Sequence, residues 1–167
     1  LKELSKNISK ELTLRASKFD VGTNDVIRPN QIIFASTGVI GEKYPLEEIK
    51  KNIPELVDKL KVIQNKYVWL KAASAIKTIE RITKIDSEEC KIWDKKIKIY
   101  AIAKGSGMIA PNMVTMLAFL FTDADISNSV LRALWKRNVG CSVNAVTVES
   151  DTSTSDPNAI LAHTHSA

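Results

Sequence analysis

The sequence of 167 residues is short of the residue types on which several kinds of catalysis depend. Its only histidines, His163 and His165, stand two residues apart among the last few positions, so a rigid Ser–His–Asp or Cys–His arrangement is not expected. Its only cysteines, Cys90 and Cys141, are far apart, which fits a reduced cytoplasm and argues against a disulfide framework. Neither HExxH nor a paired-cysteine pattern occurs, so no metal site is predicted.

Long apolar runs are also missing. No stretch approaches the roughly 20 residues that a membrane helix needs, and the Lys-, Glu- and Ser-rich start does not resemble a secretory signal. The formal net charge is +5, but the basic residues between Lys43 and Lys104 are interleaved with acidic ones. Such interleaving is typical of solvated faces, so we expect a cytoplasmic protein with neither a membrane nor a nucleic acid as partner. The alternative, an RNA-binding α/β module, would need aromatic–basic surface pairs, which we do not find.

What the sequence does contain is a pattern that predicts a single mixed α/β domain. Apolar positions at helical spacing predict helices over 1–15, 46–60, 69–79 and 126–139. Short apolar or alternating runs predict strands over 31–35, 97–103, 115–121 and 142–148. Residues 90–94 and 97–103 are expected to form a hairpin that turns at residues 94–96.

The strongest functional signal is the stretch KGSGMIAPNMVTML at residues 104–117, between two predicted strands. Gly105, Gly107 and Pro111 permit a tight, non-repeating backbone there. A loop held between two strands is where a scaffold can present catalytic side chains. It is not a Walker-type phosphate loop, because Lys104 precedes the glycines instead of following them.

This motif, followed by FTDA at 121–124, resembles the ornithine acetyltransferases, also called bifunctional glutamate N-acetyltransferases. STGVIG at 36–41 and DTSTSD at 151–156 resemble further segments of that family, in the same order. The resemblance covers only the middle of the family's chain, so we expect a central fragment or an unusually short relative. It implies an αββα fold, in which mixed sheets lie between helix layers.

In that family the chain cuts itself before the threonine of this motif. The resemblance places the cut between Val114 and Thr115, which would divide one catalytic domain, 1–167, into an α part (1–114) and a β part (115–167). Thr115 would then be the nucleophile and its freed α-amino group the base, which suits a chain without a usable histidine. The family usually has alanine at position 114, where the β-branched valine crowds the carbonyl and predicts slower cleavage.

The resemblance also implies roles for four other residues. Thr37 and Gly38 would form the oxyanion hole, because a glycine lets a backbone N–H approach closely and a threonine hydroxyl is a second donor. From the residues alone, a strand-exit turn is the better interpretation of this segment. Lys104 would pair with a substrate carboxylate, against the alternative of a surface lysine at a strand end. Thr78 falls where a family threonine contacts substrate, although its neighbours differ and a helix-end threonine is the alternative.

The implied reaction is acetyl transfer from N2-acetylornithine to glutamate in arginine biosynthesis, by a ping-pong mechanism through acetyl-Thr115. No cofactor would stay bound, although some relatives also accept acetyl-CoA as donor. The implied assembly is a heterotetramer of two α and two β chains. Two alternatives remain: a related aminopeptidase or amidohydrolase with an N-terminal threonine, and an uncleaved, inactive fragment.

Overall fold

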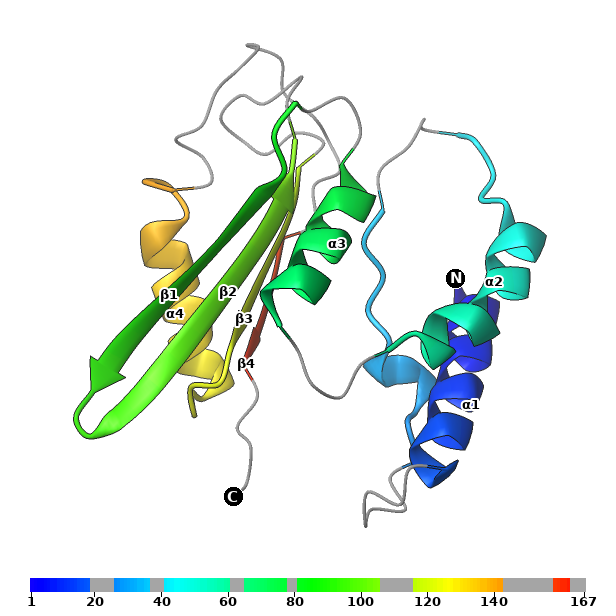
Figure 1. The fold of residues 1–167 in the computed structure, drawn as a ribbon, viewed down its shortest axis with the longest axis horizontal. Helices are drawn as coiled ribbons and strands as arrows, with labels where there is room; N and C mark the ends of the chain where they lie inside the picture. The colour runs from blue at the N-terminus through cyan, green and yellow to red at the C-terminus, as the bar shows by residue number, and fades with distance from the viewer. Residues whose placement is uncertain are drawn as a thin grey trace. The chain divides into compact units, whose positions relative to one another are not determined.

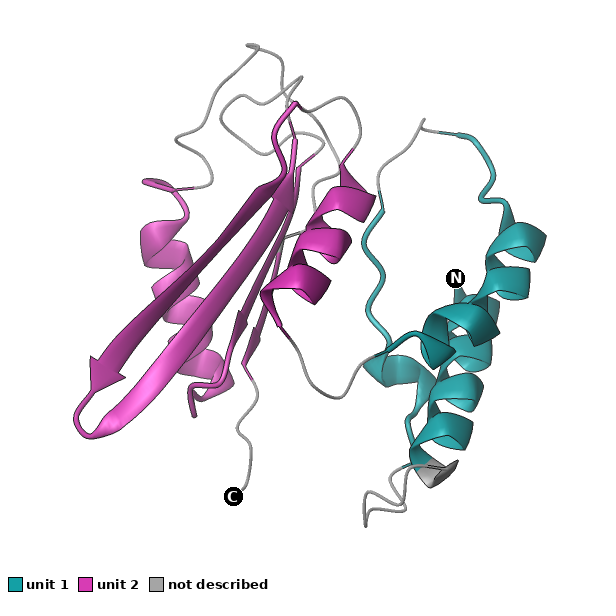
Figure 2. Ribbon diagram, viewed as in Figure 1, with its two compact units in different colours: residues 1–63 teal, residues 64–167 magenta. Residues whose placement is uncertain are grey.

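The computed structural model describes residues 1–18, 26–36, 41–60, 65–77, 81–105, 116–142 and 158–162. These residues form helices and one sheet, so the predicted α/β class is confirmed (Figure 1). The chain divides into two compact units, Leu1–Ile63 and Gln64–Ala167, which are described separately (Figure 2). The single catalytic domain and the second sheet stay predictions. Within the described residues, no helix has the length and apolar character needed to cross a membrane.

The first unit is built on a helix pair, α1 (Lys2–Lys18) and α2 (Leu46–Asp58), which confirms the helices predicted over 1–15 and 46–60. Apolar positions three and four residues apart give each helix one apolar stripe, and burying these stripes stabilises the pair. The side chains at the centre are Leu4, Ile53 and Val57, at 2%, 3% and 6% exposure. Pro54 lies inside α2.

An ion cluster joins the two helices at their surface. The Lys50 ammonium donates to Glu3 of α1 at 2.6 Å and to Glu47 of its own helix at 2.7 Å. The hydrogen bond and charge of Lys50 lower the pKa of Glu3. The hydrogen bonds from Glu3 and Glu47 in turn raise the pKa of Lys50.

The strand predicted over residues 31–35 is wrong. Pro29–Gln31 form a short 3-10 helix, η1, and the residues after it belong to no strand of the described sheet. Phe34 instead packs against the core of the helix pair, while Ile33 is 74% exposed. A short apolar run does not by itself distinguish a strand from an extended segment that covers a helix pair, because a strand also needs a neighbour for its backbone groups.

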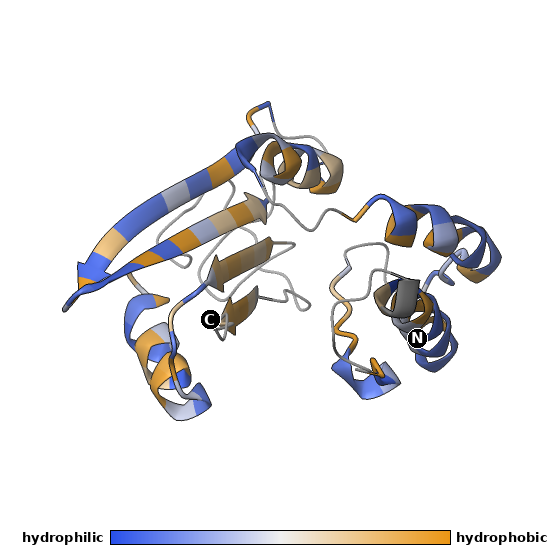
Figure 3. Ribbon diagram, turned by 60° about the horizontal axis from the view of Figure 1, so that its bottom comes forward, coloured by the Kyte–Doolittle hydropathy of each residue, from blue (hydrophilic) through white to orange (hydrophobic). Residues whose placement is uncertain are grey.

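The second unit is a four-stranded sheet in the order β1-β2-β3-β4. β1 (Lys84–Ile92) and β2 (Lys95–Lys104) form an antiparallel hairpin, β3 (Leu117–Thr122) pairs antiparallel with β2, and β4 (Asn158–Ala162) pairs parallel with β3. β3 and β4 are hydrophobic along most of their length, whereas β1 is mostly hydrophilic (Figure 3). The apolar centre of the sheet therefore lies away from β1, which is an exposed edge strand.

Helix α3 (Lys66–Ile76) covers one face of this sheet. Trp69 stacks on Tyr100 with ring centroids 5.3 Å apart and planes within 4°, and it meets Phe121 at 4.8 Å in a tilted geometry. Because Tyr100 and Phe121 are paired across β2 and β3, their side chains share this face. Helix α4 (Asn128–Asn138) lies on the other side of the sheet, behind it in Figure 1.

Both helices of this unit begin at a polar cap that the predicted bounds missed. α3 starts three residues before the predicted position 69 because the Asn65 side chain accepts from the N–H of Val68 at 3.0 Å. α4 starts two residues after the predicted position 126, because Ser127 precedes it and its side chain accepts from the N–H of Val130. Two of its apolar residues, Val130 and Leu134, are 51% and 44% exposed.

The strand predictions around the loop were right in place and less accurate in length. The hairpin turns at Trp93 and Asp94 instead of residues 94–96, and β1 begins at Lys84, well before the predicted position 90. β3 confirms the strand predicted over 115–121. β4 was not predicted, and most of the strand predicted over 142–148 lies outside the described residues.

We predict that Lys50→Met lowers the melting temperature of the helix pair slightly at neutral pH, as expected for an exposed ion pair. Folding lowers the pKa of Glu3 below its ordinary value of 4.5. The stabilisation from the ion pair is therefore fully present above pH 4.5, and it is lost as the pH falls through the pKa of Glu3 in the folded protein. The two proteins should therefore melt alike in acid. Lys59→Met is the control, because Lys59 directly follows α2 and pairs with Glu55 of that same helix, without contacting α1 in this ion pair. Circular dichroism melts against pH measure both, and a difference that persists in acid would contradict the assignment.

Candidate active site

Lys104 is the one predicted site residue that the described part of the structure contains. It is the last residue of β2, and only 3% of its surface is exposed. The alternative of a surface lysine at a strand end is therefore wrong. A lysine is rarely buried unless its ammonium has a partner. The other predicted site residues, Thr37, Gly38, Thr78, Val114 and Thr115, lie outside the described residues.

The sheet fixes both ends of the glycine-rich connection. Lys104 is paired with Leu117, the first residue of β3, so the connection over residues 105–116 leaves and re-enters the sheet at neighbouring positions. Paired residues on antiparallel strands have Cα atoms roughly 4.5–5.5 Å apart. The motif is thus presented from the ends of two strands that lie inside the sheet, where both have neighbours on each side.

A second lysine, which the sequence analysis missed, holds the start of this connection. The Lys84 ammonium donates to the carbonyl oxygen of Gly105. Lys84 is the first residue of β1 and is paired with Ala103, one residue before Lys104. The contact between Lys84 and Gly105 depends on the register of the β1–β2 hairpin. It could have been predicted from the sequence only if the first residue of β1 had been predicted correctly.

The backbone at Gly105 is of a kind that favours glycine. Its φ is +143°, a region that side chains with a Cβ rarely adopt. The glycine that follows β2 is therefore required by backbone geometry as well as by loop tightness.

The STGVIG segment is also held at its two sides, within the first unit. Ser36 and Tyr44 share a hydrogen bond between their hydroxyl oxygens at 2.6 Å, and Gly41 has a φ of +91°. Thr37 and Gly38 fall between these two hydrogen-bonded residues. Their predicted oxyanion role stays a prediction.

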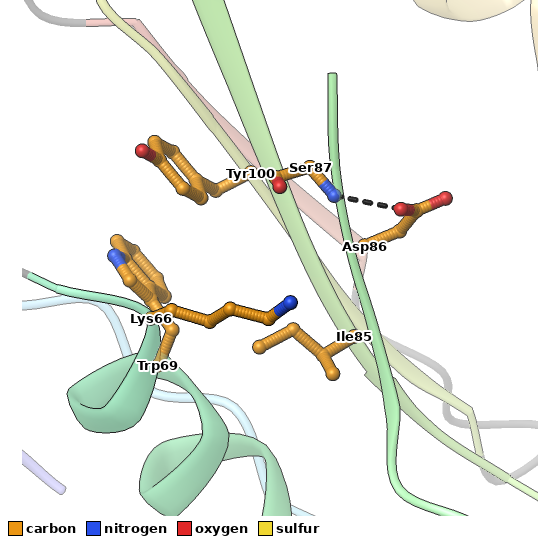
Figure 4. Close-up of a pocket in the computed structure, with 6 residues that line it drawn as sticks. All are labelled: Lys66, Trp69, Ile85, Asp86, Ser87 and Tyr100. Atoms are coloured by element: carbon orange, nitrogen blue, oxygen red, sulfur yellow. Dashed lines mark hydrogen bonds between the residues drawn. The ribbon is translucent and has the colours of Figure 1, made fainter.

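A cavity of about 190 Å³ lies at a different place, beside the edge strand β1 (Figure 4). Among the described residues that line it, none is a predicted site residue. Its lining comes from α3, β1 and β2 and consists of Lys66, Trp69, Ile85, Asp86, Ser87 and Tyr100. Among the described residues, no group of His, Cys, Asp and Glu side chains could hold a metal ion.

The sheet and the buried Lys104 define a class of protein: an α/β protein that presents a glycine-rich loop from the ends of two paired inner strands. Within this class the chain belongs to the ArgJ family, whose model matches residues 10–167. The family inferred from the three motifs is therefore confirmed.

Individual relatives agree with this assignment. The chain is 43% identical over 145 residues to the arginine biosynthesis bifunctional protein ArgJ of Rhizobium meliloti, covering 87% of this chain and 33% of the relative. It is 44% identical over 137 residues to ArgJ 2 of Clostridium acetobutylicum, covering 82% and 33%. The ArgJ of Chlorobaculum tepidum is 43% identical over 136 residues, covering 81% and 33%. The chain thus spans about a third of the length of these relatives.

We predict that Gly105→Ala destabilises the second unit by about 1–3 kcal/mol, because alanine at φ +143° is strained. Gly140→Ala is the matched control, since its φ is not in that region and a Cβ there would meet no atom within 4 Å. Denaturant unfolding followed by tryptophan fluorescence measures both variants. Equal stability of the two variants would show that the backbone conformation at position 105 does not need glycine.

Proposed function

We propose that this chain is the central third of an enzyme that transfers an acetyl group from N2-acetylornithine to glutamate in arginine biosynthesis. The observation that carries the proposal is the ArgJ family match, which runs from residue 10 through the whole glycine-rich motif. The curated relatives are named arginine biosynthesis bifunctional proteins. The buried Lys104, at the point where the motif leaves the sheet, supports a site at that loop.

The first step is self-cleavage. The Thr115 hydroxyl oxygen attacks the carbonyl carbon of Val114, the C–N bond breaks, and an ester forms while the nitrogen takes up a proton. Water then hydrolyses the ester and leaves Thr115 with a free amino group and a free hydroxyl. A loop closed at both ends by the Lys104–Leu117 pair favours this attack, because it limits the conformations of the reacting segment.

Acetyl transfer then uses the same hydroxyl. The Thr115 amino group accepts the hydroxyl proton as the oxygen attacks the acetyl carbonyl, and ornithine leaves with its amine protonated. The Thr37 hydroxyl and the Gly38 N–H stabilise the oxyanion. The amine of glutamate next attacks acetyl-Thr115 and releases N-acetylglutamate.

Lys104 pairs with a substrate carboxylate in this scheme, and a charge-assisted contact of this kind is stronger where water is excluded. Thr78 contacts the same substrate. No cofactor is resident, acetyl-CoA can replace acetylornithine as donor, and the processed enzyme assembles as two α and two β chains in the cytoplasm.

We expect Thr115→Ala to remain a single chain, because it lacks the attacking oxygen, while Thr115→Ser still cuts itself. Intact mass of the purified proteins gives the result directly. N-terminal sequencing of the smaller fragment should read Thr-Met-Leu-Ala. Wild-type protein that stays uncut after prolonged incubation would favour the alternative of an uncleaved, inactive fragment.

We expect Val114→Ala to cut faster than the wild type, because removing the β-branch opens the approach to the carbonyl carbon. Val114→Ile keeps the branch and serves as the control, with a rate close to that of valine. A time course of refolded precursor on a denaturing gel compares the three. Equal rates for alanine and valine would show that crowding at this carbonyl does not limit the reaction.

The acetyl acceptor is tested in a chimera, because the chain spans only a third of its relatives. Residues of this chain replace the matching segment of the Rhizobium meliloti relative, and the product is assayed with acetylornithine and glutamate. Formation of N-acetylglutamate with ornithine supports the proposal, and Thr37→Ala should slow it by about 10²–10³. Release of free acetate without acetylglutamate would favour the amidohydrolase.

A further inference from the structure

The first residue of the glycine-rich connection, Gly105, combines burial with a free backbone. It is buried, and its φ of +143° lies where residues with a Cβ are rarely found. A buried carbonyl oxygen needs a donor, because leaving it without one costs the free energy of a lost hydrogen bond. Glycine also places the fewest steric limits on its own peptide planes. The direction of the Gly105 carbonyl is therefore set by the groups that donate to it.

The Lys84 ammonium is such a donor, and it comes from another strand. Lys84 begins β1 and is paired with Ala103 of β2, so the two side chains lie on one face of the sheet. Gly105 follows Ala103 by two residues, which makes it a diagonal neighbour of Lys84, within reach of a long side chain. The contact thus follows from the β1–β2 register, and a shift of one residue would remove it.

Lys84 and Lys104 lie on opposite faces of the sheet. Lys104 shares its face with Tyr100, against which α3 packs, because the two are separated by an even number of residues on β2. Lys84 is half-buried on the other face, and its ammonium already contacts the backbone. The two lysines therefore have separate tasks. Lys104 binds substrate in the proposed reaction, whereas Lys84 contacts the start of the connection.

The Lys84 contact is directed at the backbone and not at a carboxylate. None of the ion pairs among the described residues includes Lys84, although Asp86 lies on the same strand and the same face. A hydrogen bond from an ammonium to a carbonyl is charge-assisted and is roughly twice as strong as one between neutral groups. Replacing Lys84 by an apolar side chain of similar length therefore removes this backbone contact without breaking a described ion pair.

A fixed Gly105 carbonyl restricts how the connection can start. The Cα, carbonyl carbon and oxygen of Gly105 define the plane of the peptide that follows, because a peptide unit is planar. At the other end, Leu117 stands two residues after Thr115 and is held by its pairing with Lys104. Restricting the glycine end as well reduces the conformational entropy that the connection loses when it reaches a reactive geometry.

We propose that Lys84 is a positioning residue for self-cleavage. By donating to the Gly105 carbonyl, it holds the start of the connection in the conformation from which the Thr115 hydroxyl attacks Val114. This role rests on the proposed function, since it concerns the same cut. Lys84 acts through the backbone of Gly105 and neither gives nor takes a proton in the bond changes.

A time course of self-cleavage in the full chain tests this role. We expect Lys84→Met to cut about 10- to 100-fold more slowly than the wild type, the loss expected for one hydrogen bond from a charged group. Lys84→Arg keeps a charged donor and should recover much of the rate. Lys98→Met is the matched control and should cut at the wild-type rate, because Lys98 belongs to the same hairpin but pairs with Glu89. Denaturing gels compare the four proteins well below their melting temperatures.

The possible failures of this experiment differ from one another. Equal rates for Lys84→Met and the wild type would overturn the role of Lys84 while leaving self-cleavage in place. Slowing by Lys98→Met as large as that by Lys84→Met would also overturn it, because the effect would not be specific to the Gly105 contact. A wild type that does not cut would overturn self-cleavage itself, and the positioning role with it.

A spectroscopic measurement tests whether Lys84 acts through Gly105. Thr115→Ala lacks the attacking hydroxyl, so it provides an uncut chain, and glycine labelled with carbon-13 at the carbonyl reports on Gly105 by NMR. The Gly105 resonance is assigned by its absence after Gly105→Ala. Loss of the charged donor in Lys84→Met should move this resonance upfield, whereas Lys98→Met should leave it in place. An unmoved resonance would overturn the proposal, even if Lys84→Met cuts slowly.

Discussion

The antiparallel pairing of β2 with β3 is the constraint on which the arrangement of the glycine-rich loop depends. Six residue pairs, from Ile99 with Thr122 to Lys104 with Leu117, hold the two strands in register. A shift of one residue would move every side chain of a strand to the other face. Lys104 would then leave its buried position, and the loop would start from the wrong side of the sheet.

Helix α3 supports this pairing with contacts to both strands. Trp69 contacts rings on both strands of the pair, Tyr100 of β2 and Phe121 of β3. Alternation along β2 places Ile102 and Lys104 on the same face as Tyr100, and they are 7% and 3% exposed. Strand parity therefore places Lys104 on the face of the sheet that α3 covers.

The sequence could predict the helices and the loop because their signals are local. The apolar stripe of α2 and the glycines after Lys104 are visible within a few residues. The wrong or missing strand predictions concern contacts between distant segments. Residues 31–35 have no neighbouring strand in the described sheet, and β4 is a strand because it pairs parallel with β3. At the candidate site, motif similarity identified the family and Lys104, whereas the contact from Lys84 depends on a hairpin register that no short pattern encodes.

The proposed cut between Val114 and Thr115 lies in the connection between β2 and β3, so it would divide the strands of this sheet between two chains. β1, β2 and α3 would remain in one product, and β3, β4 and α4 in the other. Contacts besides the strand ladder also join the two products, among them Trp69 against Phe121 and the N–H of Lys98 with the Asp123 carboxylate. Losing one covalent bond therefore leaves the packing of the unit in place, because the ladder and the aromatic contact do not depend on chain continuity. The proposed cut lies beyond the Lys104–Leu117 pair, at the end of β2 and β3 opposite the Lys98–Asp123 contact. It would free the Thr115 amine while β2 and β3 stay paired.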